Sequence, residues 1–359
     1  APYCSVVYGA AGVAAALCHV AVLRGDPALL SLADEWAVRA ARDAAGRYAF
    51  TSDVIEVNEE ITGRVTPFHR LSGVHAVQVL VSHALDDPGA RQDALNGFVA
   101  ESRQPCANLD LTLGRSGTLL GASILLEAVG GPAHADLSAL VTLGNETVAE
   151  LWAELDAMPP VAEATELSYL GVAHGWAGVL LATLRWTRAS GASMPSAVAD
   201  RLDQLASLAE PAGAGLRWTW TNRHGPGPSS TMAGWCNGTA GYVHLWTIAH
   251  EMLGDDRWGT LAEKAGWDVY TAGNRTAQLC CGLAGQAYAL LELYRHTGEQ
   301  RWLTASAELA ARAANGAGGG FSESFIPGSL HKGDVGIAVL AADLEQPERS
   351  SMPFFGYGG

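Results

Sequence analysis

The chain has 359 residues and a formal net charge of −15, from 37 acidic and 22 basic residues. Such an excess of negative charge repels phosphate groups, so nucleic acid is excluded as an expected partner. With 48% hydrophobic residues, the chain can bury the core of one large domain or of two ordinary ones. Six cysteines over this length are too sparse for a disulfide framework and indicate a reducing cytoplasm.

The first 23 residues carry no charge, but they lack the basic start of a signal peptide and contain Gly9-Ala10-Ala11-Gly12. They predict a buried helix. The uncharged run Leu167–Leu184 holds His174 and two glycines of the same motif, so no membrane segment is expected. The chain begins with Ala1 rather than Met, which fits a piece excised from a longer protein.

A repeated motif, Gly-x-x-Gly followed by an apolar stretch, organises the whole chain. Six copies begin at Gly9, Gly114, Gly175, Gly238, Gly282 and Gly333, and a degenerate copy begins at Arg70. Successive copies are 61, 44, 61, 63, 44 and 51 residues apart, which is enough for two helices and their connections. Each repeat therefore predicts a helical hairpin.

The helix after each motif, such as Val13–Leu23, is apolar on nearly every side and is expected in an inner layer. Polar breaks such as Gly254-Asp255-Asp256 introduce amphipathic helices of an outer layer. Seven such hairpins packed side by side predict an all-α fold, an α/α toroid with the glycine turns around the mouth of a central cavity. At these turns glycine is expected to provide positive φ and close backbone approach.

Three cysteines lie at these turns: Cys236 in Trp-Cys-Asn-Gly, and the adjacent Cys280 and Cys281 in Cys-Cys-Gly, 44 residues further on. Thiolates suit Zn²⁺, and three protein ligands leave a fourth position for water or substrate, as in catalytic zinc sites. The three residues are therefore predicted to bind one zinc ion. The alternative is three buried cysteines that only pack, because free cysteine is often buried.

One segment breaks the repeat pattern. Glu210–Gly234 is rich in glycine, proline and serine and carries Trp218, Trp220, Arg223 and His224. It predicts a long loop, which either covers the cavity or makes a solvated excursion from the surface.

In these motifs the chain resembles the lanthionine cyclases and other lanthionine synthetase C-like (LanC-like) proteins along essentially its whole length. The resemblance rests on the hairpin repeats, His174-Gly175-Trp176-Ala177-Gly178, Trp235-Cys236-x-Gly238 and the cysteine pair. It implies an α/α toroid with zinc at the mouth. The family's familiar ligands are Cys, Cys and His, so Cys281 in the histidine position implies a three-cysteine variant, as in some fused synthetases. The resemblance implies a single cyclase domain, residues 1–359, and is compatible with a domain excised from such a synthetase.

The resemblance also implies a reaction. A cysteine thiol of a dehydrated precursor peptide adds to dehydroalanine or dehydrobutyrine, and an enolate then takes up a proton. His174 matches the family's acid/base histidine, and Asp110 matches an aspartate that orients it. Each residue also has a purely structural alternative: His174 as a histidine hydrogen-bonded in a helix junction, and Asp110 as the N-cap of a helix. A dehydratase or kinase-like domain or protein upstream is the expected partner that prepares the peptide.

Two positions depart from the family pattern. Met232 stands where single-domain cyclases have an arginine, and Asn237 stands where they have tyrosine or histidine, so a cation for the enolate is missing there. Arg223, Arg217 or Arg115 are candidates to replace it. The residues beside other turns, His69, His331 and Lys332, are expected to be structural.

Three other functions remain as alternatives. A LanC-like enzyme could add glutathione to dehydroamino acids in proteins, and a non-catalytic module could keep zinc for structure and bind a peptide. A toroidal glycoside hydrolase would need two carboxylates facing each other across the cavity, and no convincing pair occurs at the turns.

Overall fold

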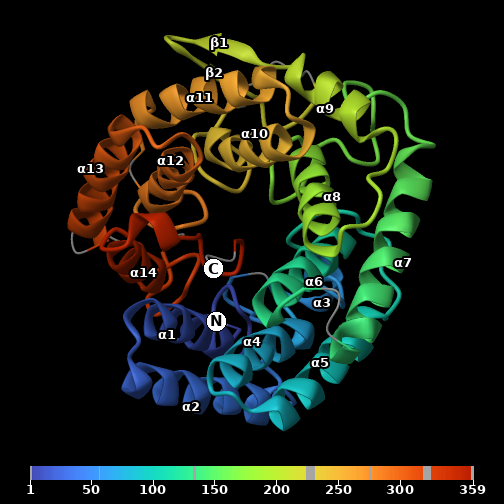
Figure 1. Cartoon of the computed structure of the whole chain (residues 1–359), viewed down its shortest axis with the longest axis vertical. Coiled ribbons are helices and arrows are strands. Elements are labelled where there is room, and N and C mark those ends of the chain that lie inside the picture. Colours follow the sequence, from blue (N-terminus) through green and yellow to red (C-terminus); the bar gives the residue numbers. More distant parts are fainter. Residues whose placement is uncertain are drawn as a thin grey trace.

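The computed structural model describes residues 2–55, 57–131, 135–223, 231–274, 276–317 and 325–356. Within them the chain forms a ring of helices in two layers (Figure 1). The inner layer consists of α1 (Ala10–Arg24), α4 (Leu71–Ala84), α6 (Arg115–Val129), α8 (Trp176–Ser190), α10 (Thr239–Leu253), α12 (Leu283–Thr297) and α14 (Val335–Asp343). The outer layer consists of α2 (Pro27–Asp43), α5 (Pro88–Ser102), α7 (Ser138–Leu155), α9 (Val198–Ala206), α11 (Asp256–Thr271) and α13 (Gln300–Ala317). The predicted α/α toroid is confirmed.

The inner helices are buried because their small and aliphatic side chains meet neighbours on both sides of the layer. Five of them end at a glycine with positive φ: Gly25, Gly130, Gly191, Gly254 and Gly298. Only glycine adopts this left-handed cap conformation without strain, so the glycines fix where each inner helix stops.

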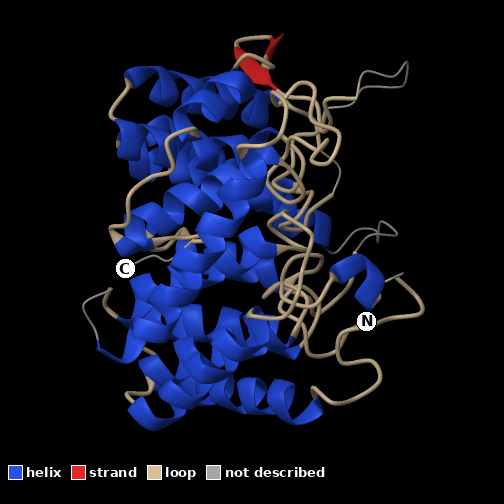
Figure 2. Ribbon diagram, turned by 90° about the vertical axis from the view of Figure 1, so that its right-hand side faces the viewer, coloured by secondary structure: helices blue, strands red, loops and turns tan. Residues whose placement is uncertain are grey.

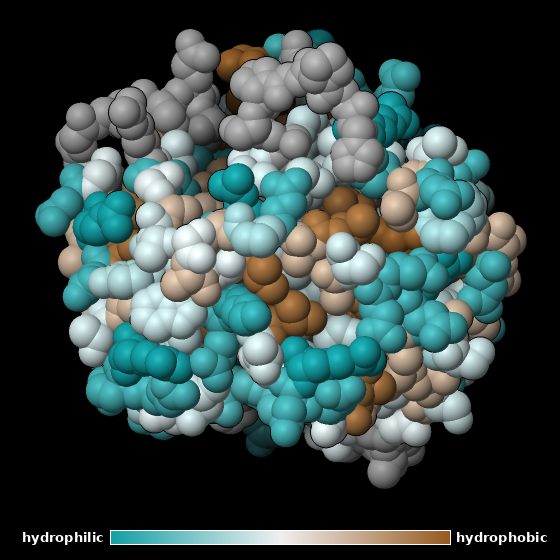
Figure 3. All heavy atoms as spheres, turned by 90° about the horizontal axis from the view of Figure 1, so that it is seen from above, coloured by the Kyte–Doolittle hydropathy of each residue, from teal (hydrophilic) through white to brown (hydrophobic). Residues whose placement is uncertain are grey.

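The outer helices begin differently. Asp26, Asp87 and Asp255 cap α2, α5 and α11 by accepting hydrogen bonds from backbone N–H groups of the first turn. Seen from the edge of the ring where α9 and α11 lie, the outer wall is mainly hydrophilic with small separate apolar patches (Figure 3). One face of α11 therefore meets solvent while the other packs on α10 of the inner layer.

The motif glycines before the inner helices have negative φ, such as −125° at Gly9 and −141° at Gly175. The prediction of positive φ at these turns was wrong. Close backbone approach is confirmed, because a Cβ on Gly178 would overlap the carbonyl of Val172 and one on Gly12 would overlap that of Val6. Glycine is needed at these turns because helix and incoming chain pack backbone against backbone.

The ring closes where α14 packs against α1. Asp343 on α14 has a fully buried side chain and accepts hydrogen bonds from Tyr288 Oη at 2.6 Å and His19 Nε2 at 2.7 Å. At the surface, Arg24 binds both carboxylate oxygens of Glu345 at 2.9 Å. A buried carboxylate that takes two donors and a bidentate ion pair together join the last repeat to the first.

The seventh repeat has an inner helix, but a short 3₁₀ helix, η2 (Pro347–Arg349), follows it where an outer α-helix was expected. After η2 the chain turns into the ring, and residues 350–355 are buried. Residues 350–356 lie inside the ring, and Ser351, Pro353 and Phe354 border a cavity with the C-terminal halves of α1, α4 and α6, away from the connecting loops that Figure 2 shows on the other side. The last segment therefore fills the end of the barrel that faces away from the glycine turns.

The remaining elements are α3 (Glu59–Thr62), η1 (Ala135–Leu137) and an antiparallel hairpin of β1 (Glu210–Ala212) and β2 (Gly215–Arg217). The hairpin packs against α11 in the outer layer, so the first part of the segment Glu210–Gly234 does not cover the cavity. Trp218 is fully buried and stacks on Tyr242. His224 lies outside the described residues.

None of the helices in the described ranges combines the length and the apolar character needed to cross a membrane.

Candidate functional site

A ring of hydrogen bonds joins the turns at the mouth of the barrel. It uses the residue two positions before each motif: Val7, Phe68, Thr112, Ala173, Cys236, Cys280 and His331. The backbone N–H of each donates to the carbonyl of the next at 2.6–3.2 Å, and His331 donates back to Val7. The one exception lies between Phe68 and Thr112, where the Thr66 hydroxyl accepts from Phe68 and donates to Thr112. The repeat thus fixes equivalent residues in order around the barrel axis.

The next residue in each turn carries most of the polar candidates. These residues are Tyr8, His69, Leu113, His174, Asn237, Cys281 and Lys332. All except His69 are partly exposed. Because they share one repeat position, their side chains surround one opening even though they lie far apart in the sequence.

The structure brings the three predicted metal ligands together. Cys281 Sγ lies 3.5 Å from Cys236 Sγ and 3.4 Å from Cys280 Sγ, and all three sulfurs lie within 4.8 Å of one another. Tetrahedral zinc with bonds of about 2.3 Å places its sulfur ligands about 3.8 Å apart. Two of the three separations lie within a few tenths of an ångström of this value, so the three sulfurs form a suitable donor set for a zinc ion.

A lysine stands beside these sulfurs. Lys332 Nζ donates to Cys281 Sγ at 3.4 Å. Hydrogen bonds from Cys236 and Cys280, together with the Lys332 ammonium, lower the pKa of Cys281. Burial alone would lower the pKa of Lys332, but the three neighbouring thiols raise it overall. The site therefore combines a thiolate with an ammonium group, and that group stays charged. The sequence signal for Lys332 was its repeat position, one residue before the glycine, but it was expected to be structural.

His174 and Asp110 also meet at the mouth. Asp110 Oδ2 lies 3.2 Å from His174 Nδ1, and the Thr112 hydroxyl lies 3.1 Å from the same nitrogen. Asp110 Oδ1 in addition accepts from the backbone N–H of Leu113. The aspartate therefore both holds its own turn and contacts the histidine. With Nδ1 occupied, Nε2 is the ring nitrogen available for proton exchange with a substrate.

Of the three arginines considered for the missing cation, Arg115 is held by Glu154 at 2.6 Å and Glu150 at 3.9 Å. Arg223 is exposed. Arg217 lines an open cavity of about 560 Å³ that also reaches Met232 and Cys281. Its Nε lies 3.9 Å from Glu210. Arg115 is thus neutralised by its partners, and Arg217 lies on the wall of a space that leads to the sulfurs.

Below the mouth several buried polar atoms have no hydrogen-bond partner among the described residues. They are Nδ1 of His69, both ring nitrogens of His331 and Nε1 of Trp235. Burial lowers the pKa of His69 and of His331 to about 3, so both rings are neutral. Buried polar atoms in proteins normally find a protein, water or ligand partner.

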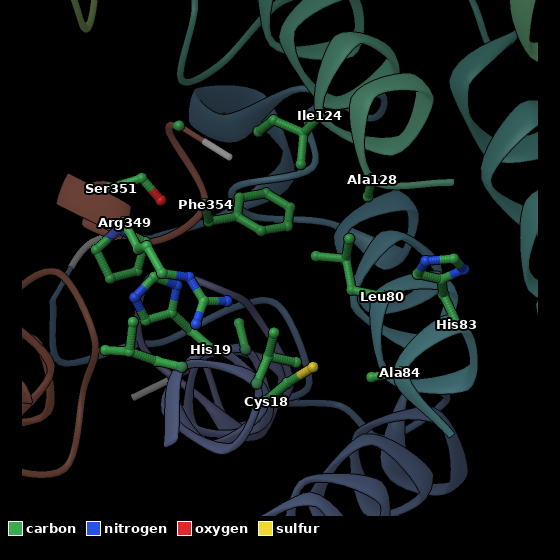
Figure 4. Close-up of a pocket in the computed structure, with 15 residues that line it drawn as sticks. Cys18, His19, Leu80, His83, Ala84, Ile124, Ala128, Arg349, Ser351 and Phe354 are labelled. Atoms are coloured by element: carbon green, nitrogen blue, oxygen red, sulfur yellow. The ribbon is translucent and has the colours of Figure 1, made fainter. Parts of the chain in front are cut away.

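A second cavity, of about 310 Å³, lies at the far end of the barrel (Figure 4). It is enclosed by the C-terminal halves of α1, α4 and α6 and by the segment that follows η2. Leu80, Ile124 and Phe354 line it, with Cys18 and His19 from α1. None of the residues predicted to bind metal or to catalyse a reaction lies there.

Comparisons with known proteins agree with this geometry. A family model described as "Lanthionine synthetase C-like protein" matches residues 3–356. A curated relative, "Glutathione S-transferase LANCL1" of Danio rerio, is 23% identical over 98% of this chain and 85% of its own length. Among solved structures, "Nisin cyclase" superposes with a TM-score of 0.72 at 15% identity, over 99% of this chain and 90% of that one. The last comparison shows a shared fold.

Proposed function

The chain belongs to the lanthionine synthetase C-like family, and from this we propose that it is a zinc-dependent cyclase that forms lanthionine or methyllanthionine rings. The observation that carries the proposal is the meeting of three cysteine sulfurs with an Asp110–His174 pair around one opening. Cys236, Cys280 and Cys281 are the proposed zinc ligands, His174 the proton shuttle and Asp110 the residue that orients it. Residues 1–359 act as one cyclase unit in this proposal.

Zinc in the three-cysteine site would hold the peptide thiol as a thiolate, the nucleophilic form of sulfur, near neutral pH. The sulfur then adds to the β-carbon of a dehydroamino acid, and the carbon–carbon π bond breaks as the carbon–sulfur bond forms. Negative charge passes to the carbonyl oxygen as an enolate. His174 accepts the thiol proton and returns a proton to the α-carbon.

Asp110 supports this role by holding the His174 ring through Nδ1. A carboxylate that accepts from Nδ1 stabilises the positive charge of the ring while it carries a proton, and it turns Nε2 toward the substrate. Thr112 contributes a second contact to the same nitrogen. Both partners come from the turn before α6, whereas His174 comes from the turn before α8. The proton shuttle therefore depends on two adjacent repeats.

The substrate in this proposal is a dehydrated precursor peptide, prepared by a dehydratase or kinase-like domain or protein. A peptide suits the site because Cys281 borders an open cavity of about 560 Å³. The exposed ring of Tyr169 lies 6.2 Å from the ring of His174 and 5.7 Å from the exposed ring of Trp220, measured between centroids. The two aromatic rings offer an apolar surface for peptide side chains.

The test is cyclisation of a dehydrated cysteine-containing peptide. Cyclisation leaves the peptide mass unchanged but removes a thiol, so thiol alkylation followed by mass spectrometry measures it. We expect zinc bound in a 1:1 ratio and loss of alkylatable thiol with the wild-type chain. Cys281→Ala should lose both, whereas Cys18→Ala, a buried cysteine at the far end of the barrel, should keep both. Full cyclisation by metal-free protein would contradict the proposal.

A second candidate function is the addition of glutathione to dehydroamino acids, because one relative carries the name glutathione S-transferase. The two functions share the same chemistry and differ in the source of the sulfur. A dehydrated peptide without cysteine separates them. A mass increase of one glutathione on that peptide favours the transferase. No addition to it, together with loss of the thiol at unchanged mass in a dehydrated peptide that does contain cysteine, favours the cyclase.

A further inference from the structure

Lys332 is the described cation that directly contacts the sulfur cluster. Its ammonium donates to Cys281 Sγ at 3.4 Å, and its backbone is fixed on both sides. The Lys332 carbonyl accepts from Ile326 N–H at 2.8 Å, and the preceding residue, His331, belongs to the hydrogen-bonded ring of turns. The side chain is partly exposed at the mouth. It is therefore positioned by the backbone and can still reach a bound molecule.

The closure of the toroid places Lys332 between two neighbours. Around the mouth, the seventh turn lies between the sixth, which carries Cys281, and the first, which carries Tyr8. Of the three arginines considered above, Glu154 holds Arg115, and Arg223 is exposed. Arg217 lines the cavity that reaches Cys281, but its Nε lies 3.9 Å from Glu210. Among the described residues considered for this role, Lys332 is the one that touches a sulfur.

The reaction creates a need for a cation close to sulfur. Three thiolates and one zinc ion carry a net charge of −1, and addition to the alkene moves a further negative charge to the carbonyl oxygen. That oxygen lies four atoms from the attacking sulfur through the β-carbon, α-carbon and carbonyl carbon. A cation that touches one sulfur of the cluster is thus within reach of the oxygen of a substrate whose sulfur joins the same cluster.

We propose that the Lys332 ammonium donates a hydrogen bond to the carbonyl oxygen of the dehydroamino acid and stabilises the enolate until His174 protonates the α-carbon. This inference rests on the proposed function. An ammonium has three N–H donors, so one can remain on Cys281 while another points to substrate. No bond to Lys332 forms or breaks, and the proton balance between thiol, His174 and α-carbon is unchanged.

The experiment compares Lys332→Met, which keeps the length of the side chain and removes its charge, with Lys332→Arg. Lys264→Met, an exposed lysine on α11, is the matched control. Each full-length variant is loaded with zinc for kinetics on the dehydrated peptide, and with Co²⁺ for spectroscopy. Metal content and the sulfur-to-cobalt charge-transfer band report on the thiolates independently of turnover.

We expect Lys332→Met to bind metal in a 1:1 ratio, to shift the charge-transfer band, and to lose about 100-fold in kcat with little change in KM, as when an oxyanion donor is removed. Lys332→Arg should recover at least a tenth of wild-type kcat, and Lys264→Met should match the wild type. If the charge-transfer band of Lys332→Met were the same as that of the wild type, the contact between Lys332 and Cys281 would be contradicted. This result does not depend on any turnover of substrate.

Three other results would overturn the inference, each in a different way. Wild-type kcat in Lys332→Met would exclude enolate stabilisation while leaving the cyclase proposal intact. Loss of metal in this variant would make the lysine a structural partner of the thiolates. Absence of cyclisation by the wild-type chain loaded with zinc would instead reject the proposed function, and with it the role of Lys332.

Discussion

Two cysteines show how the ends of this barrel differ. At the far end, burial raises the pKa of Cys18 to about 12, so that thiol stays protonated. At the mouth, hydrogen bonds from Cys236 and Cys280 and the Lys332 ammonium lower the pKa of Cys281. The same ring of helices bears both ends, yet the far end keeps a cysteine inert, whereas at the mouth one cysteine of three favours its thiolate while the pKa of Cys236 and that of Cys280 are raised. The polar surroundings of the thiol, rather than its burial, decide its chemistry here.

The backbone explains why the ends differ. At the mouth, hydrogen bonds between turns satisfy the backbone and leave one side chain per turn free to vary, as with Tyr8, His174 and Cys281. At the far end, the segment after η2 fills the ring with Phe354 and Phe355. The predicted metal-binding and catalytic residues thus lie at the mouth, and the segment after η2 supplies aromatic packing at the far end. The following predictions test this division of the barrel.

The largest effect is expected at the mouth. Cys281→Ser should abolish metal binding and lower cyclisation on the order of 10³-fold or more, because a metal ion contributes several kcal/mol to such reactions. Cys18→Ala should leave both unchanged. Metal analysis and the alkylation assay measure this pair. If Cys18→Ala lost as much metal binding and cyclisation as Cys281→Ser, the far end would also contribute to metal binding and catalysis, and the comparison would fail.

Removal of a buried aromatic ring from the segment after η2 should affect stability rather than metal binding or cyclisation. Phe354 is buried and packs edge-on against Phe68, with ring centroids 5.8 Å apart. We expect Phe354→Ala to lower the free energy of unfolding by about 3–5 kcal/mol, since it deletes a large buried ring. Urea unfolding measures the loss. The cyclisation rate per folded molecule should stay near that of the wild type, and a fall as large as that of Cys281→Ser would contradict the comparison.

Acid should weaken the far end through His244. This buried ring packs on Phe355, and burial lowers its pKa to about 4. As pH falls below about 6.5, the unfolded chain gains a proton that the folded chain does not, so the free energy of unfolding falls by about 1.4 kcal/mol per pH unit. Below about pH 4 both states are protonated and the loss levels off.

The variant His244→Gln isolates this contribution, because glutamine does not titrate. The difference in unfolding free energy between wild type and variant should change by about 2 kcal/mol between pH 7 and pH 5, in the direction of a weaker wild type in acid. Urea unfolding at both pH values measures it. A difference that stays constant would show that His244 binds its proton equally in the folded and the unfolded chain.

The smallest effect concerns Asp110. Asp110→Asn keeps an oxygen for the Leu113 N–H but removes the negative charge next to His174. We expect kcat to fall by about 10-fold, equivalent to about 1.4 kcal/mol, and stability to change by less. The N-cap variant Asp26→Asn on α2 should leave kcat unaltered. Equal kcat in Asp110→Asn and wild type would reduce Asp110 to a residue that only holds its turn.

The sequence by itself determined the repeat and therefore the toroid. Each glycine motif marks where an inner helix begins, and the spacing leaves room for two helices, so the hairpins follow from local signals. The cysteine trio was also accessible, because Cys236 and Cys280 share one repeat position and Cys281 follows directly. Motif position predicts which side chains surround the mouth, since equivalent turns of a closed ring share one orientation.

Only the tertiary structure decided what depends on ring closure. The sequence did not pair Lys332 with Cys281, because the lysine was assigned no partner and the contact spans 51 residues. It also predicted an outer helix for the last repeat, where a 3₁₀ turn and an inserted segment are found. Such features arise from packing between distant elements, which a local pattern does not encode. The repeat therefore set the positions at the mouth, and closure of the ring determined which residues meet there.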